Sequence, residues 1–214
     1  MDDSLFFEQH CGRRLLDSSQ PRPTTRPLME IRHTEVHGWI GFQLIPWLSA
    51  SSGVPETELA EFRTCMSELF NNIQDHTEYD VGSVFAQWYP QEHKLEIVVA
   101  DFGSGIPRTV RTVEAIDSDA NAILRSFDEG FSAKSRPTNR GAGLHYLRQN
   151  VLDNLGGNLR VHSGSGVVRF EKNGNSHQVK LCEGSGFCPG TMVELEIRTD
   201  RIEFDEVNDG SFEW

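Results

Sequence analysis

The sequence predicts an α/β domain in which amphipathic helices cover a β-sheet. Helical periodicity is clearest between residues 55 and 75, where apolar residues recur at three- and four-residue spacing and give one buried stripe. Two strand patterns follow, at residues 84–89 and 95–100, joined by a short connection that starts at Pro90. The second strand is apolar on both faces from Ile97 onward, as expected for a central strand.

The other predicted elements lie on either side of this region. The apolar stretch from Trp39 to Leu48 has the pattern of a helix that then stops, although Pro46 can shorten it. Residues 109–127 carry another helical pattern, and residues 143–155 carry a third, which Gly156-Gly157 ends. Four apolar segments are expected to finish the chain as short strands in a meander: residues 159–161, 167–170, 179–181 and 192–197.

The ends of the chain and one internal segment differ from this pattern. Residues 1–36 are expected to form an extended arm or linker, because three prolines between Pro21 and Pro27 exclude a regular helix. One domain then spans residues 37–200, followed by an acidic tail over residues 201–214. Residues 128–140 have almost no apolar content and predict a long loop, which is usually functional or mobile.

The charge balance excludes some function classes. The 214 residues include 20 Lys and Arg against 32 Asp and Glu, a net charge of −12. Such a field repels a phosphate backbone and an anionic lipid surface, so neither nucleic acid nor membrane is an expected partner. No window approaches the ~18 apolar residues of a membrane helix, and no signal peptide is recognisable, so we expect a cytoplasmic protein. Its cysteines are expected to be free thiols, with pairing of Cys182 and Cys188 as the alternative.

A polar helix face is the first of four segments with a chemical signature. Glu68 and Asn72 are four residues apart and therefore point the same way from the predicted helix, and Asp75 and His76 extend this face. An amide oxygen can ligate Mg²⁺, which also keeps several waters and the nucleotide phosphates. A nearby carboxylate can activate a nucleophile. A solvated helix face is the alternative interpretation.

The second segment, Asp101-Phe-Gly103-Ser-Gly105-Ile106, directly follows the central strand. A carboxylate at a strand end can accept a hydrogen bond from an exocyclic amine, which selects adenine over guanine. The glycines beside it let the backbone approach a flat ring. A simple strand–helix turn is the alternative. The Asp-Phe-Gly motif of eukaryotic-type protein kinases is excluded, because neither a His-Arg-Asp loop nor a glycine-rich strand pair precedes Asp101.

The third and fourth segments are glycine turns. The run Arg140-Gly141-Ala142-Gly143-Leu144 lies where the long loop becomes a helix, and free amide groups at a helix start favour an anion. Lys134 and Arg140 add positive charge to this loop. Gly190-Thr191 starts the last strand and offers a hydroxyl group, although a plain β-turn is the alternative.

In this order, the four segments resemble the GHKL superfamily of ATP-binding domains, shared by histidine kinases, anti-sigma serine kinases, the Hsp90 chaperone, type II topoisomerases and MutL proteins. The resemblance covers residues 37–198 and is closest to the stand-alone and histidine-kinase branch. It implies a two-layer α/β sandwich, the Bergerat fold, with a mixed, mostly antiparallel sheet and helices on one face. ATP is expected between a helix and a lid.

The resemblance also implies roles for single residues. Glu68 would polarise a nucleophile, Asn72 would ligate Mg²⁺ and Asp101 would bind the adenine amine. The other expected site residues are Asp75, His76, Gly103, Gly105, Ile106, Lys134, Arg140, Gly141, Ala142, Gly143, Leu144 and Thr191. Two features depart from histidine kinases: Asp75 stands where they often carry Lys, and no phosphoacceptor His helix pair precedes the domain.

Two functions are compatible with these features. The first is a catalyst, a stand-alone ATP-dependent protein kinase or ATPase that uses Mg²⁺ and acts in signal transduction with a separate, unidentified protein partner. The second is an ATP-binding switch, in which nucleotide orders residues 128–140 and creates or hides a partner surface with little chemistry. Retention of Glu68 favours the catalyst, and a homodimer is left open.

Overall fold

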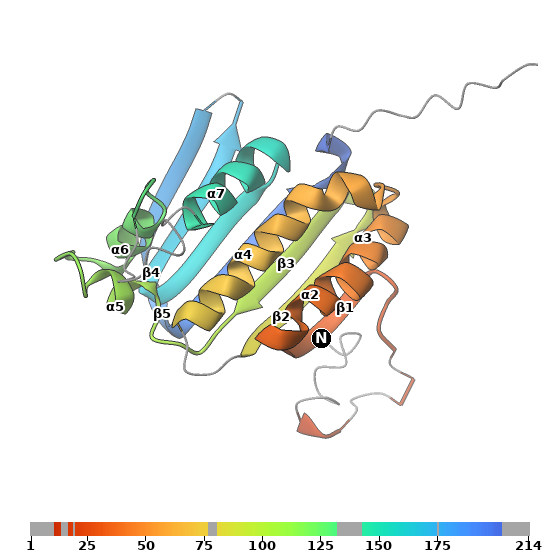
Figure 1. Ribbon diagram of the computed structural model, residues 1–214, viewed down its shortest axis with the longest axis horizontal. Helices are drawn as coiled ribbons and strands as arrows, with labels where there is room; N and C mark the ends of the chain where they lie inside the picture. The colour runs from red at the N-terminus through yellow and green to blue at the C-terminus, as the bar shows by residue number, and fades with distance from the viewer. Residues whose placement is uncertain are drawn as a thin grey trace, which may run out of the picture.

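The computed structural model describes residues 11–13, 17–18, 20–76, 81–131, 143–174 and 176–202. In these residues, one five-stranded sheet has the order β1-β2-β3-β5-β4, and helices cover one of its faces (Figure 1). The strands are β1 (Thr25–Arg32), β2 (Val81–Tyr89), β3 (Lys94–Ala100), β4 (Asn158–Asn173) and β5 (Ser176–Arg198). The predicted two-layer α/β sandwich is therefore confirmed. Every strand pair among the described residues is antiparallel.

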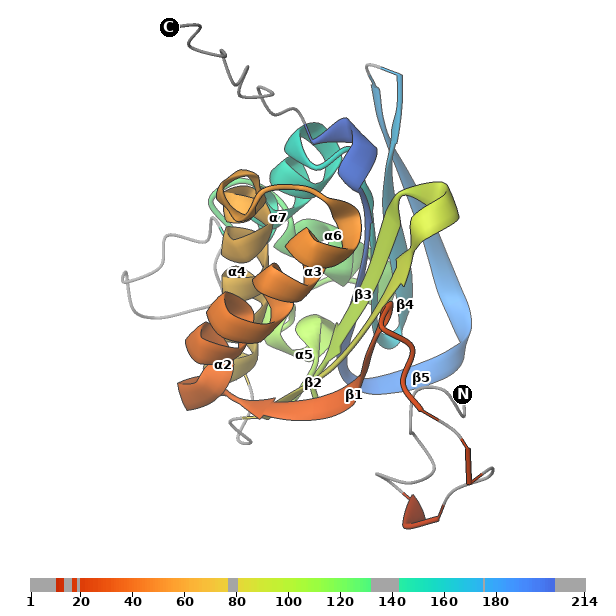
Figure 2. The same cartoon turned by 90° about the vertical axis from the view of Figure 1, so that its right-hand side faces the viewer.

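The sheet buries only one face. Along β3, Leu95, Ile97 and Val99 are buried beneath the helices, whereas the residues between them are partly exposed on the other side. Figure 2 shows the helices gathered on one side of the sheet. The prediction of a central strand is confirmed, because β3 is the third of five strands, but the expected burial of both its faces is wrong. Val98 faces the open side, where apolar residues do not need a covering helix.

The first helical region is longer than the sequence predicted. It begins with α2 (His33–Trp39), passes through a π-helical turn over residues 40–44 and continues as α3 (Ile45–Ser52). Pro46 does not shorten it, because proline is tolerated in the first turn of a helix and the wider turn precedes it. Gly53 ends α3 with a φ of 79°, and its N–H donates to Ser49 O at 2.9 Å.

Helix α4 (Ala60–His76) crosses the middle of the sheet (Figure 1). A 3₁₀ turn over Glu56–Leu59 leads into it. Its predicted apolar stripe is confirmed, because these side chains are buried: Leu59, Phe62, Met66, Leu69, Phe70 and Ile73. Each large apolar side chain contributes about 1.5–3 kcal/mol when fully buried. The polar face of α4 is therefore held in place by the packing of its opposite face.

The predicted helical pattern over residues 109–127 is two helices, α5 (Ile106–Val110) and α6 (Asp119–Ser126). Ser118 separates them, because its Oγ accepts a hydrogen bond from Asn121 N at 3.1 Å and caps α6. Val113, one of the apolar residues within that predicted range, is 56% exposed in the connection between the two helices.

Helix α7 (Gly143–Gln149) continues as a π-helical turn over residues 150–154, and Gly156 follows with a φ of 56°. This agrees with the predicted helix. The four short strands expected after it are instead two long ones, β4 and β5, which form a hairpin that extends past the helices (Figure 2). Their register shifts between Ser163 and Gly166, where β5 has extra residues. Glycines mark bulges as well as turns, and this explains the mistaken segmentation.

The N-terminal arm predicted for residues 1–36 contributes an element of the fold. Its Thr25–Arg32 segment is extended, as expected, and pairs with β2 as an edge strand of the sheet. Pro27 is accommodated because it lies at a register shift of an edge strand, where a ladder N–H is not needed. The division of the chain at residue 37 stays a prediction. All four cysteines are free, and no helix in the described ranges is long and apolar enough to cross a membrane.

Candidate functional site

The polar face of α4 meets the start of α7. A Cβ atom at Gly143 would lie 2.8 Å from Glu68 Oε2 and 3.9 Å from both side-chain polar atoms of Asn72. A glycine at this position therefore lets the backbone of α7 approach Glu68 and Asn72 closely. Two of the predicted segments, more than seventy residues apart in the sequence, thus form one junction.

Asn72 presents an unsatisfied polar group at this junction. Its Nδ2 atom is buried and has no hydrogen-bond partner among the described residues. A buried polar group without a partner costs about 1–3 kcal/mol, and a bound acceptor, such as a phosphate oxygen, would satisfy this donor. Because a side-chain amide carries both a donor and an acceptor, Asn72 can offer its oxygen from the same position when the amide is turned.

A hydrogen bond between α4 and α7 supports this junction, because Tyr146 Oη donates to Glu61 Oε2 at 2.8 Å. Asn150, in the π-helical turn that continues α7, donates from Nδ2 to the Tyr146 carbonyl at 3.0 Å. Between Glu61 and Glu68 lies Cys65, which is buried. Burial, together with the negative charge of these two carboxylates, raises the pKa of the Cys65 thiol to about 12. Cys65 is therefore a neutral packing residue rather than a nucleophile.

Asp101 lies at the end of β3, as the sequence predicted. Its N–H donates to Thr191 O at 2.9 Å, and its Oδ1 accepts from Gly103 N at 2.7 Å, which fixes the direction of the carboxylate. A Cβ atom at Gly190 would lie 2.6 Å from Asp101 Oδ1 and would collide with the backbone of the same residue. Burial raises the pKa of the nearby Cys188 thiol, and the Asp101 charge adds to this.

Ser163 joins the two glycine-containing segments on this side of the site. Its hydroxyl donates to Gly190 O at 2.7 Å, accepts from Ile106 N at 3.0 Å and lies 3.3 Å from Thr191 Oγ1. The predicted residues Gly105, Ile106 and Thr191 are therefore brought together around a serine to which the sequence assigned no role. A buried serine in a strand has no local sequence signature, so its role is recognised only from the residues that it contacts in the structure.

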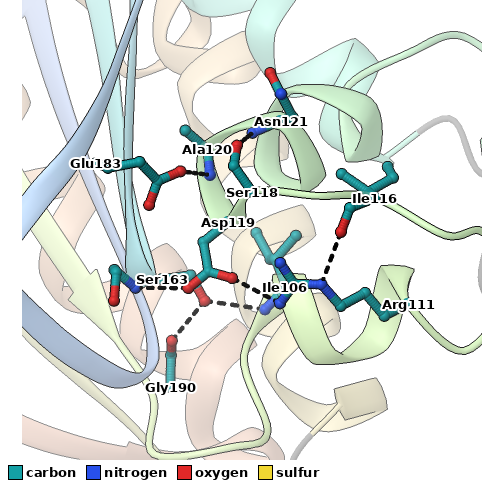
Figure 3. A network of polar contacts seen from close by, with 11 residues as sticks. Ile106, Arg111, Ile116, Ser118, Asp119, Ala120, Asn121, Ser163, Glu183 and Gly190 are labelled. Atoms are coloured by element: carbon teal, nitrogen blue, oxygen red, sulfur yellow. Dashed lines mark hydrogen bonds and ion pairs between the residues drawn. The ribbon is translucent and has the colours of Figure 1, made fainter.

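A second network fastens α6 to the β4–β5 hairpin (Figure 3). Asp119 accepts hydrogen bonds from Arg111 Nη1 at 2.7 Å and from Ser165 N at 2.8 Å. Glu183 Oε1 accepts from Ala120 N at 2.9 Å. Burial raises the pKa of Asp119, but the hydrogen bond from Ser165 and the positive charge of Arg111 outweigh it, so the pKa lies below its usual range.

Replacing Asp119 by Asn is expected to lower the melting temperature at pH 7 by about 2–4 °C, as loss of roughly 1 kcal/mol gives for a chain of this size. A carboxyl group with a lowered folded pKa stabilises above its unfolded pKa of about 3.9, and this stability is lost as pH falls through the folded pKa. Thermal unfolding of parent and variant from pH 7 to pH 2.5 should therefore show the two curves converging below about pH 4. Asp200→Asn, which removes an exposed ion pair with Arg198, is the control and should change little. A difference in melting temperature between parent and Asp119→Asn that stays constant down to the lowest pH contradicts a lowered pKa of Asp119.

The other predicted site residues divide into two groups. Ile106 and Leu144 are partly buried and pack against the core, so they also have a structural role. Asp75 and His76 belong to the end of α4, and their side chains lie outside the described part of the structure. The remaining predicted residues of the loop also lie outside the described residues: Lys134, Arg140, Gly141 and Ala142.

Comparisons with known proteins were made for the sequence and for the fold. The model of the family of histidine kinase-, DNA gyrase B- and HSP90-like ATPases matches residues 58–201. Over 82 residues the chain is 33% identical to the CO-responsive transcriptional regulator RcoM of Rhodospirillum rubrum, covering 38% of this chain and 34% of that protein. The chain thus spans about a third of the length of the curated relative it matches.

Among solved structures, the ATPase region of Saccharomyces cerevisiae topoisomerase II bound to ICRF-187 (dexrazoxane) is similar, with a TM-score of 0.36 and 13% identity. The likeness covers 73% of this chain and 42% of the other. It is too distant to assign a role to any residue.

Proposed function

Because this chain belongs to the family of histidine kinase-, DNA gyrase B- and HSP90-like ATPases, which supports ATP binding, we propose that it binds ATP with Mg²⁺ and either hydrolyses it or transfers its phosphate to a protein partner. One observation carries the proposal. The carboxylate of Glu68 and the unsatisfied amide of Asn72 lie together against Gly143, at the junction of two elements that the family model spans. On a helix face that is only solvated, Glu68 and Asn72 would not lie this close to the backbone of a second helix.

The adenine end is proposed at Asp101. Its carboxylate can accept a hydrogen bond from the exocyclic amine of the base, because an ionised carboxylate is an acceptor only. Gly105 and Gly190 let the backbone pack closely around Asp101, because a Cβ atom at Gly105 would meet Ser163 Oγ and one at Gly190 would meet Asp101 itself. This arrangement favours adenine, which has an amine at that position, over guanine, which has a carbonyl.

The metal is proposed at Asn72. Mg²⁺ prefers oxygen ligands and commonly takes only one or two from the protein, with waters and substrate phosphates completing its shell. The Asn72 side chain is compatible with this demand, because it carries an amide oxygen and lies with the Glu68 carboxylate beside Gly143. When bound, Mg²⁺ would neutralise charge on the phosphates. The phosphate contacts proposed for Lys134, Arg140, Gly141 and Ala142 rest on the sequence alone.

Glu68 is proposed as the general base. It would take the proton of an attacking water or hydroxyl group while the oxygen of that group forms a bond to the γ-phosphorus. The bond from the γ-phosphorus to the bridging oxygen breaks, and ADP leaves with that oxygen. The acceptor, whether water or a side chain of a partner protein, decides between an ATPase and a kinase. A cytoplasmic location and a homodimer stay predictions.

The test is incubation of the purified chain with γ-labelled ATP under two conditions, one with Mg²⁺ and one with an excess of chelator in place of Mg²⁺. ATP binding is measured under the same two conditions. Mg²⁺-dependent release of labelled phosphate, or transfer to a protein in a host extract, supports the catalyst. The alternative, an ATP-binding switch, predicts tight binding without release or transfer. Absence of ATP binding in both conditions contradicts the proposal as a whole.

Gly143 gives a direct check of the junction. Gly143→Ala places a methyl group 2.8 Å from Glu68 Oε2, a distance that side chains essentially never adopt, so that the carboxylate or α7 must shift. We expect about a tenfold loss of ATP turnover, since catalytic groups need to be held within about 0.5 Å. Gly38→Ala is the control, because Gly38 also lies in a helix but has open space around it, and it should leave turnover unchanged. Equal turnover in both variants contradicts the proposed place of Glu68.

A further inference from the structure

We propose that Ser163 is a positioning residue that sets the preference of this site for an adenine base. Its hydroxyl holds the loop that follows β3 against the Gly190-Thr191 segment of β5 (Figure 3). The inference rests on the proposed function, because it concerns how the adenine end of that site is built. Ser163 itself is fully buried, so it acts through its neighbours and does not touch a ligand.

The hydroxyl of Ser163 satisfies one group on each of two segments. Ile106 is the first residue of α5, and an N–H in that position has no partner within its own helix. Ser163 Oγ supplies the missing acceptor at 3.0 Å. The same oxygen donates its hydrogen to Gly190 O at 2.7 Å. One buried hydroxyl therefore joins two distant segments, since Ser163 is 57 positions from Ile106 and 27 positions from Gly190 in the sequence.

The backbone around this hydroxyl is shaped to admit it. Gly105 has a φ of +76°, a conformation that favours glycine, and a Cβ atom there would lie only 2.8 Å from Ser163 Oγ and 3.1 Å from Gly190 O. A side chain at position 105 would push the loop away from the serine. The closeness of Gly105, Ser163 and Gly190 is thus a built feature rather than an incidental contact.

The link reaches Asp101 through the backbone. Gly190 lies directly against Asp101, and Asp101 N donates to Thr191 O at 2.9 Å. Loosening Gly190 from Ser163 therefore changes the support of the carboxylate that is proposed to accept the adenine amine. The phosphate end, at Asn72 on α4, shares none of these contacts. Loss of the Ser163 hydroxyl should weaken recognition of the amine and leave phosphate binding nearly intact.

The ratio of the affinities for ATP and inosine triphosphate measures this effect, and a general loss of stability would not change that ratio. ATP and inosine triphosphate carry the same ribose and phosphates, but inosine triphosphate has a carbonyl where ATP has the amine. In Ser163→Ala, affinity for ATP should fall about tenfold, while affinity for inosine triphosphate should change by less than about twofold. Ser163→Thr keeps a hydroxyl at the same branch and should restore most of the preference for ATP. Both dissociation constants are measured with Mg²⁺ by titration calorimetry.

Thr199→Val is the matched control. Thr199 is buried in the 3₁₀ turn that directly follows β5, and its hydroxyl donates to His93 O at 3.3 Å. The substitution replaces this hydroxyl group with a methyl group of similar size. This variant should keep the ATP preference of the parent protein. If Ser163→Ala does not fold, Ser163→Cys is measured instead, because a thiol is a weak donor and acceptor and should also narrow the preference.

The outcomes separate this inference from the proposed function. A parent protein that binds no ATP overturns the proposed function, and the inference with it. A parent that prefers ATP, together with a folded Ser163→Ala or Ser163→Cys variant that keeps the same ratio of affinities, overturns the inference alone. A folded Ser163→Thr variant that loses the preference overturns it as well, because the hydroxyl would then not be the group that matters.

Discussion

Replacing Glu68 by Gln is expected to lower ATP turnover by about 10²–10⁴-fold, the usual contribution of a general base, while ATP affinity changes little. Gln keeps the size of the side chain and its packing against Gly143, but its neutral amide cannot take a proton at neutral pH. Glu68→Ala should give a similar loss of turnover. Phosphate release and ATP affinity, measured on the same preparations, check the result.

Asn72→Ala provides the contrast to this variant. Removing the amide should abolish the strengthening of ATP binding by Mg²⁺, and turnover should fall with it. Glu68→Gln should keep the Mg²⁺ dependence of binding. The two residues lie one turn apart on α4, so the pair of variants separates the metal site from the base.

Neither variant should unfold the domain. The stability of α4 comes from its buried face, where Phe62, Met66 and Phe70 are almost completely inaccessible to solvent. Unchanged melting temperatures therefore support the assignment of roles. If Glu68→Gln turns over ATP at the parent rate, Glu68 is not the base. A parent protein without turnover, even with its partner present, leaves the switch as the better description.

The parts of the site that the sequence predicts are those with local signals. The spacing of Glu68 and Asn72 places them on one face of a helix, and the buried stripe on the other face fixes which way they point. Asp101 follows an apolar strand, so its place at a strand end is also a local inference. The structure adds the meeting of α4 with α7 at Gly143, which the spacing of the motifs alone does not give.

The role of Ser163 could not be predicted, because it depends on contacts between distant segments. Its partners, Ile106 and Gly190, lie on different elements, and a serine next to glycines in a strand also fits a turn. The length of β4 and β5 was underestimated from the sequence, because the glycines at the bulge near Gly164 have the pattern of a turn that ends a strand. The edge strand Thr25–Arg32 was not predicted as part of the sheet, because Pro27 argues against a regular strand. An edge strand tolerates proline, since one side of it makes no ladder hydrogen bonds.

Replacing Asp101 by Asn is expected to weaken ATP binding by about thirty- to a thousandfold. Asn can keep the Oδ1 acceptor for Gly103 N, so the turn after β3 should remain. The second position becomes an amide donor, which faces the adenine amine, also a donor. Loss of a hydrogen bond to a charged group, with polar groups left unpaired, costs roughly 2–4 kcal/mol, and this corresponds to the expected loss of affinity.

Calorimetric titration of ATP, with Mg²⁺ present, into the parent protein, Asp101→Asn and Asp153→Asn tests the central claim most directly. Asp153 pairs with Lys172 and His177 away from the proposed site, so Asp153→Asn controls for the loss of one negative charge from an acidic chain. We predict that the parent and Asp153→Asn bind ATP with similar affinity and that Asp101→Asn binds at least thirtyfold more weakly, by the ~2 kcal/mol lower estimate. Near-parental ATP binding by Asp101→Asn contradicts an ATP site whose adenine end is Asp101.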